Sequence, residues 1–181
     1  GLEKAARDRH AMGNFVRGDG GHLAHSRISR HSFEAVVVLC SIQYMPDLAK
    51  AIATAAQASK PDAKLVVFMT HPAFRIPRQR GWEFDQGRKL YYRRIDSYMS
   101  DLSIPLRPHF RTKQPLTRSY HRPIGSYISE LVHHGYHIDR FKEIPYHSPK
   151  NEKNSAMKRA ESEIPHFLAI RARYHPSEAH S

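Results

Sequence analysis

An acidic residue and two glycines follow the first short apolar segment of the chain. The segment NFVRG, residues 14–18, leads directly into Asp19, Gly20 and Gly21. An acidic residue with glycines at the end of a strand often meets a small ligand in a doubly wound α/β fold. Asp-Gly is also a common turn pair, so a simple turn is the alternative interpretation. Such folds usually carry an earlier glycine-rich loop for a phosphate or nucleotide, and this sequence holds none before residue 14.

The 14 histidines could in principle bind a metal or move a proton. The run HHGYH brings His133, His134 and His137 close together in the sequence. We predict no metal site there, because His133 and His134 are adjacent at a helix end and point in different directions. No carboxylate or cysteine completes a ligand set, and the chain shows no Ser-His-Asp arrangement.

The charge balance favours acidic partners. The chain carries 29 Lys and Arg against 17 Asp and Glu, a formal net charge of +12. Nucleic acid, anionic lipid or a phosphorylated substrate would match this charge, whereas a basic surface that serves solubility is the plainer interpretation. The basic residues form no long block, so nucleic-acid binding is an alternative that we do not favour.

Length and composition predict one domain over residues 1–181 with a real core, since 40% of the residues are hydrophobic. No apolar run approaches the roughly 20 residues that span a membrane, and no signal peptide is visible. The single cysteine, Cys40, rules out an internal disulfide and fits a reducing compartment, so we expect a cytoplasmic protein with no membrane partner. The chain begins without Met, and we expect it to be processed, tagged or truncated.

The apolar pattern predicts the elements that position these groups. Residues 2–12 favour a helix and residues 14–18 a strand. The run FEAVVVLC, residues 33–40, is typical of a strand buried on both faces, as in a parallel sheet. A helix over residues 46–59, with Pro46 as its first residue, and a buried strand over residues 64–69 complete a βαβ unit, with residues 60–63 ending the helix.

The second half of the chain begins with a long basic and aromatic segment. We interpret about residues 72–121 as an inserted cap, in which LYYRRIDSY forms a strand of a hairpin. Pro123 then opens a helix that ends at Gly135. Strands are predicted over residues 136–144 and 167–174, with a loop and a short helix between them.

This order of elements resembles the C-terminal two-thirds to three-quarters of a class I S-adenosylmethionine-dependent methyltransferase of the broad small-molecule (type 11-like) kind. The resemblance implies a Rossmann-like α/β sheet of strand order 3-2-1-4-5-7-6, mostly parallel with an antiparallel C-terminal strand. It also implies S-adenosyl-L-methionine as the cofactor and a small-molecule acceptor. The stretches that carry it are LEKAARDRH, FVRGDGGHL, FEAVVVLCSIQYMPDLAKAIATAAQASKPDAKLVVFMTHP, HRPIGSYISELVHHGYHI and PHFLAIRARY.

The resemblance assigns cofactor-binding roles to five residues. Asp19 matches the carboxylate that accepts a hydrogen bond from the adenine amino group, and Gly20 matches the neighbour whose backbone N–H faces the ring. Cys40 and Ser41 match positions near the methionine part of the cofactor. Gln43 stands where the family often has His or Gln facing the sulfonium or the substrate, and a contact within the helix N-terminus is its alternative.

The acceptor side is less well defined by the resemblance. His71, after the fifth strand of the family, could act as a general base for an acceptor hydroxyl, because its unperturbed pKa lies near neutrality. A buried or packed histidine is the plainer alternative. Aromatic and basic residues of the cap could line an acceptor pocket or serve packing and solvation: Trp82, Tyr91, Arg93, Tyr98 and His121.

The sequence also departs from the family. It lacks the first strand with its glycine-rich turn and the second strand with its acidic residue. With strands roughly 4.8 Å apart, this leaves a gap of about 14 Å between the third and fourth strands, and residues 33–39 would form an exposed hydrophobic edge. We therefore expect N-terminal strands to be missing, the given chain to bind the cofactor weakly and the chain to be inactive alone.

Two other functions stay open beside small-molecule methylation. A non-catalytic methyltransferase-like remnant or subunit could bind RNA or a protein partner through the basic surface. An enzyme that methylates RNA is a third interpretation, weakened by the absence of an added RNA-binding module and of an Asn-Pro-Pro-Tyr-like or cysteine catalytic motif. The missing catalytic triad does not count against methyl transfer, which needs mainly alignment and exclusion of water.

Overall fold

A computed structural model describes residues 20, 29–77, 81–106, 117–145 and 154–176. The helix predicted over residues 2–12, the strand over residues 14–18 and the site candidate Asp19 lie outside these described residues. Every structural statement below concerns the described part of the chain.

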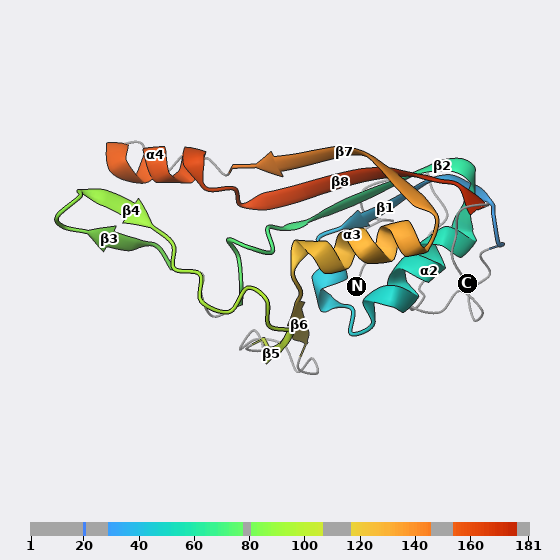
Figure 1. Ribbon diagram of the computed structural model, residues 1–181, viewed down its shortest axis with the longest axis horizontal. Coiled ribbons are helices and arrows are strands. Elements are labelled where there is room, and N and C mark those ends of the chain that lie inside the picture. Colours follow the sequence, from blue (N-terminus) through green and yellow to red (C-terminus); the bar gives the residue numbers. More distant parts are fainter. Residues whose placement is uncertain (1–19, 21–28, 78–80, 107–116, 146–153, 177–181) are drawn as a thin grey trace, which may run out of the picture.

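The central feature is a four-stranded mixed sheet of order β1-β2-β8-β7 (Figure 1). Its strands are β1 (Phe33–Leu39), β2 (Ser59–Thr70), β7 (Tyr136–Ile144) and β8 (Phe167–Tyr174). β1 is parallel to β2, and β8 is antiparallel to both of its neighbours. The predicted βαβ unit and antiparallel C-terminal strand are therefore confirmed, and the order corresponds to the 4-5-7-6 portion of the expected sheet.

Two helices, α2 (Leu48–Ala58) and α3 (Ile124–His133), lie side by side along one face of the sheet (Figure 1). Their apolar faces meet the inward-facing residues of the strands in one core, because residues on one face of a strand recur every second position. Ile52 of α2, Leu131 of α3 and Leu65 of β2 are each at most 1% exposed. The helices and sheet thus form a two-layer unit whose strand ends are held firmly.

Two predicted boundaries were wrong. Helix α2 begins at Leu48 rather than Pro46, because the Asp47 carboxylate accepts a hydrogen bond from the Lys50 N–H and caps the helix. Strand β2 begins at Ser59 rather than at residue 64. Its pairing with β1 jumps from Phe33–Ser59 to Ala35–Lys64, so the turn-forming residues 60–63 are a bulge within the strand.

Strand β1 is exposed, although its unbroken apolar sequence predicted burial on both faces. Val37 is 63% exposed and Leu39 is 65% exposed. Within the described residues, β1 pairs with β2 alone and is an edge strand of the sheet. The prediction of burial on both faces is wrong for this part of the structure, which instead shows the exposed hydrophobic edge expected at residues 33–39.

The long segment between β2 and α3 contains two hairpins. One pairs β3 (Glu83–Asp85) with β4 (Leu90–Tyr92), and the other pairs β5 (Leu102–Pro105) with β6 (Arg118–His121). The first hairpin confirms the strand predicted in LYYRRIDSY. It extends beyond the sheet beside helix α4 (Ser155–Glu163), where the Asn154 amide donates a hydrogen bond to the Tyr91 hydroxyl at 3.1 Å (Figure 1). None of the described helices is long and apolar enough to cross a membrane.

Candidate functional site

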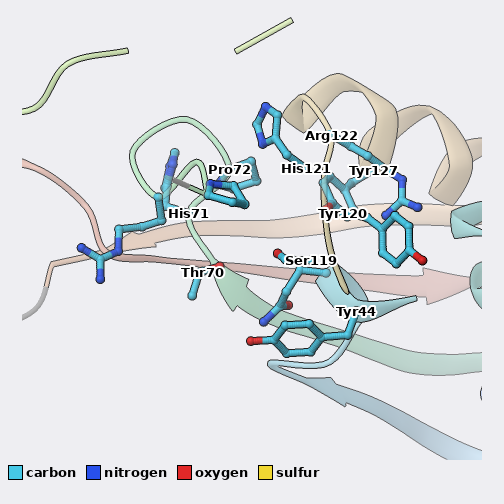
Figure 2. A pocket seen from close by; sticks show the side chains of 12 residues that line it. Tyr44, Thr70, His71, Pro72, Ser119, Tyr120, His121, Arg122 and Tyr127 are labelled. Carbon is cyan, nitrogen blue, oxygen red and sulfur yellow. The ribbon is translucent and has the colours of Figure 1, made fainter. Parts of the chain in front are cut away.

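A small cavity opens where β1 and β2 end. In open α/β sheets ligands bind outside the carboxyl ends of the strands, so this is the expected location for a site. The cavity measures about 70 Å³, and Figure 2 shows its walls. It lies between the 3-10 turn η2 (Ile42–Tyr44), the end of β2, strand β6 and the first turn of α3. Small-molecule pockets measure about 300–1,000 Å³, so the cavity accommodates one end of a larger ligand.

The loop after β1 has a strained backbone. Cys40 has φ +46°, in the left-handed region that non-glycine residues rarely adopt. The Cys40 N–H donates to the Phe68 carbonyl at 2.7 Å, which anchors the loop to β2. Gly20 lies against the same loop, because a Cβ added to Gly20 would stand 2.9 Å from Cε of Met45. Three predicted cofactor-binding residues, Gly20, Cys40 and Ser41, therefore lie in or against one loop.

Gln43 of η2 presents an unpaired oxygen inside this region. The residue is 8% exposed, and its Nε2 donates a hydrogen bond to the Cys40 carbonyl at 3.0 Å. That bond fixes the amide orientation, and the buried Oε1 has no hydrogen-bond partner among the residues that the structure describes. Buried polar atoms are nearly always paired, so this unpaired oxygen marks the loop after β1 as a candidate site.

Arg122, in the short link between β6 and α3, places its guanidinium against the backbone before α2. Its Nη2 donates to the carbonyls of Met45 at 3.0 Å and Pro46 at 2.6 Å, and its guanidinium carbon lies 5.5 Å from the centre of the Tyr120 ring. Its Nη1 is buried and makes no hydrogen bond of good geometry within the described residues, while the guanidinium interacts with the Tyr127 hydroxyl and the Asp47 carboxylate. The sequence analysis missed this residue. Its chain neighbours give no sign of the contacts, which span 76 and 77 positions.

His71 is 1% exposed and uses both ring nitrogens within the protein. Nδ1 accepts a hydrogen bond from the Ala73 N–H at 3.2 Å, so Nε2 carries the proton and donates to Oε1 of Glu143 at 2.8 Å. Burial lowers the pKa of His71, and the hydrogen bond and charge of Glu143 oppose that shift. The ring is therefore neutral and ties the end of β2 to the end of β7.

His121 also lines the cavity, 4% exposed. Its Nε2 donates to the Tyr98 carbonyl at 2.9 Å. The Tyr98 hydroxyl in turn accepts the Ile124 N–H at 2.9 Å and caps the start of α3. Beside them, burial raises the pKa of Tyr127 and the Arg122 guanidinium opposes the shift.

The other predicted acceptor residues lie elsewhere. Trp82 and Arg93 line a second cavity of about 250 Å³, where the Arg93 guanidinium lies 4.4 Å from the Trp82 ring centre. Arg75 lines both cavities. Tyr91 contacts Asn154 and belongs to neither lining. Of the predicted site residues, the smaller cavity brings together Gln43, His71 and His121.

Two arginines, Arg75 and Arg122, line the smaller cavity, and no carboxylate belongs to the described part of its lining. Carboxylates contact the lining from outside it, with Glu143 bonded to His71 and Asp47 close to Arg122. Among the described residues, no group of three or more His, Cys, Asp or Glu side chains could hold a metal ion. The two arginines of the lining favour an anionic or polar group over a cation.

No protein-family model matches the sequence, and no curated protein matches it. Several solved structures are similar to this chain. The structure of an S-adenosylmethionine-dependent methyltransferase from Mesorhizobium loti is 22% identical, with 96% of this chain and 77% of that chain covered and a TM-score of 0.70. A protein of Listeria monocytogenes assigned provisionally to the same class is 19% identical, with coverages of 96% and 74% and a TM-score of 0.72.

A more distant similarity is to the [4+2]-cyclase SpnF, which is 12% identical, with 96% of this chain and 60% of that chain covered and a TM-score of 0.52. At these identities the similarities establish the fold. The chain has the mixed α/β fold of the class I S-adenosylmethionine-dependent methyltransferases, and the activity must be argued from the site.

Proposed function

We propose that this chain belongs to an S-adenosylmethionine-dependent methyltransferase that acts on a small-molecule acceptor. The observation that carries the proposal is the unpaired, buried Oε1 of Gln43 at the carboxyl end of β1. It lies beside the strained backbone at Cys40, in a fold shared with methyltransferases. Strained backbone residues cluster at ligand sites, and unpaired buried polar atoms are rare in folded proteins.

The residues present fit the proposed cofactor. Gly20 lies against the flexible end of the Met45 side chain in the loop after β1, and Gln43 holds a buried acceptor oxygen in the same loop. We propose that the cofactor is held by Asp19, Gly20, Cys40, Ser41 and Gln43. When bound, S-adenosylmethionine supplies a methyl group already activated on a sulfonium. The residues of the chain then have to bind and orient both reactants and exclude water.

His71 is better suited to positioning than to proton transfer in the described geometry. For the general-base role, the ring would have to release either the Ala73 N–H or the Glu143 carboxylate. We propose that His71 holds the loop after β2 against β7, so that the loop keeps one wall of the acceptor cavity. A His71→Gln variant separates the roles, because a lost base changes the pH profile of kcat and a lost positioning contact changes KM.

The segment at about residues 72–121 is proposed as the acceptor cap of a single domain. Support comes from Pro72, Ser119 and His121, which line the smaller cavity. Trp82, Tyr91 and Arg93 remain proposed acceptor contacts at the rim, and the 250 Å³ cavity at Trp82 and Arg93 gives the longer part of an acceptor a second place to lie.

The alternative function is a non-catalytic methyltransferase-like protein that binds RNA or a protein partner. Its support is the net charge of +12 and the similarity of the fold to a cyclase. The alternative gives no role to the buried unpaired atoms, and we therefore favour the enzyme.

A calorimetric titration of S-adenosylhomocysteine into the 181-residue chain tests the proposal. We expect weak saturable binding that the Gln43→Ala variant loses. The matched control is Arg118→Gln, which changes an exposed arginine on β6 whose side chain donates hydrogen bonds to Ser103. Absence of binding, together with salt-sensitive binding of RNA by the same preparation, would support the alternative.

A further inference from the structure

The face of the sheet opposite α2 and α3 carries side chains to which the proposed function gives no role. Among the described residues, no helix packs over this face (Figure 1). Along β2 the core residues Leu65 and Val67 alternate with residues that are exposed or half-buried. Successive side chains of a strand point to opposite faces, so Lys64 and Phe68 lie on the side away from the core. We call this side of the four strands the open face.

The strand register brings basic residues together on the open face. Lys64 lies opposite Arg173 in the pairing of β2 with β8, and Arg171 lies opposite Arg140 in the pairing of β8 with β7. Lys142 follows two positions after Arg140 on β7 and therefore shares its face. Because paired strands lie roughly 4.8 Å apart, these five cations form one continuous surface.

Only part of this positive charge is balanced within the described part of the chain. Asp139 forms ion pairs with Arg171 at 2.7 Å and with Arg173 at 3.3 Å, and Asp62 forms a second one with Arg173 at 3.2 Å. The three other cations are exposed and form no ion pair among the described residues: Lys64, Arg140 and Lys142. We call these three the unpaired cations. Their excess of positive charge favours a polyanion as the partner of the open face.

Aromatic rings lie beside these cations. The rings of Phe68 and Phe167 stack with their centres 5.0 Å apart, and both side chains are half-buried. Phe68 pairs on one side with Leu39, which is 65% exposed, and on the other side with Ala169. Ala169 pairs in turn with Lys142, so an apolar row of the open face ends at a cation.

We propose that the open face binds single-stranded nucleic acid, with phosphates on the unpaired cations and a base stacked on the ring of Phe68. Proteins that bind single strands combine cations along the backbone with aromatic rings under the bases, and a four-stranded sheet is one such platform. An anionic membrane would use the same cations, but it offers no planar group for a half-buried ring. This inference goes beyond the proposed methyltransferase function and does not depend on it.

Fluorescence anisotropy of a short labelled oligouridylate, titrated with the 181-residue chain at several salt concentrations, tests the proposal. One variant removes the unpaired cations: Lys64→Gln, Arg140→Gln and Lys142→Gln. Each phosphate contact of a single strand contributes about 0.7 to the slope of log affinity against log salt, so we expect the slope to fall by about 2. The control makes the same change in charge at exposed residues of α2, β6 and α4, and it should keep the wild-type slope: Lys50→Gln, Arg118→Gln and Lys158→Gln.

Phe68→Leu separates stacking from charge. The variant keeps an apolar side chain on the open face and removes the ring, so we expect binding to weaken at least about fivefold with an unchanged salt slope. Urea unfolding checks that the variant folds. The charge variant alters only exposed side chains, and it decides the test if Phe68→Leu does not fold.

Three results would overturn the proposal. The two charge variants could weaken binding equally, in which case net charge alone explains it. A duplex RNA of the same length could bind as tightly as the single strand, or vesicles of phosphatidylserine and phosphatidylcholine could bind in preference to it. Binding of S-adenosylhomocysteine is measured separately, at the loop after β1. Oligouridylate binding without S-adenosylhomocysteine binding would therefore overturn the proposed function and leave this inference standing.

Discussion

Replacing Gln43 with methionine should stabilise the protein while removing a ligand contact. The unpaired Oε1 costs about 1–3 kcal/mol in the wild type, since a buried acceptor has left water without a partner. Methionine has a similar shape and no such oxygen. The variant also loses the hydrogen bond from Nε2 to the Cys40 carbonyl, which contributes about 0.5–1.5 kcal/mol. The difference leaves Gln43→Met more stable by about 1 kcal/mol.

Urea unfolding followed by circular dichroism measures this difference. For a chain of this length, 1 kcal/mol corresponds to a rise in Tm of about 2–4 °C. The matched control is Ser59→Ala, at a buried polar group that is fully paired. The Ser59 hydroxyl donates to the Ala55 carbonyl at 2.8 Å and therefore accepts from the Tyr136 hydroxyl at 3.0 Å. Its removal leaves a buried Tyr136 hydroxyl unpaired, and we expect a loss of about 1–3 kcal/mol.

The two variants should therefore change stability in opposite directions. Gln43→Met should also bind S-adenosylhomocysteine less tightly, as expected when a site residue is kept for binding at the expense of stability. A decrease of more than about 1 kcal/mol in the unfolding free energy of Gln43→Met would refute the reasoning, since Gln43 would then be a satisfied structural residue.

Three further predictions concern the fold around the site. Burial and the charges of Arg75 and Arg93 lower the pKa of His166 to about 4, so the folded state favours the neutral ring. Stability should therefore fall as the pH decreases from about 6.5 towards 4, and His166→Gln should flatten that dependence in urea unfolding. Leu39→Lys, on the exposed edge strand, should slow aggregation seen by light scattering and change the unfolding free energy by less than about 0.5 kcal/mol. Tyr98→Phe should lower the unfolding free energy by about 1 kcal/mol, because the Ile124 N–H at the start of α3 loses its acceptor; an unchanged value would show that water replaces it.

The positions of strands and helices could be predicted closely where turn-forming residues mark their ends. The strands over residues 136–144 and 167–174 were correct to the residue, and Pro123 and Gly135 flank α3 as expected. Gly135 has φ +78°, the left-handed conformation that glycine adopts at low cost after a helix. These signals are local, which is why the sequence alone was sufficient.

Features set by distant parts of the chain were not predictable. The unbroken apolar run of β1 does not reveal that only the face with Val36 and Val38 meets the core while Val37 and Leu39 are exposed, because it lacks the alternation that separates a buried face from an exposed one. At the start of α2, the Asp47 cap replaced Pro46 as the boundary, although both residues favour a helix start. The jump in pairing between β1 and β2 likewise turned a predicted loop at residues 60–63 into a bulge.

The site was predictable where it follows the topology. Gln43 and His71 come directly after parallel strands, and both line the cavity at the carboxyl ends of those strands. Arg122 was missed because it meets Met45 and Pro46 only through the packing of α3 beside α2. The roles proposed for Asp19, Trp82, Tyr91 and Arg93 remain predictions.

The most direct test of the central claim is an NMR titration of the ¹⁵N-labelled 181-residue chain with S-adenosylhomocysteine. We expect the amide resonances of Gly20, Cys40, Ser41 and Gln43 to shift together and saturate, while the resonance of Val37 on the exposed edge does not shift. If these four resonances stay unchanged at saturating ligand, or if only exposed basic residues respond, the loop after β1 is not a cofactor site. The chain would then have the fold of a methyltransferase without the proposed activity.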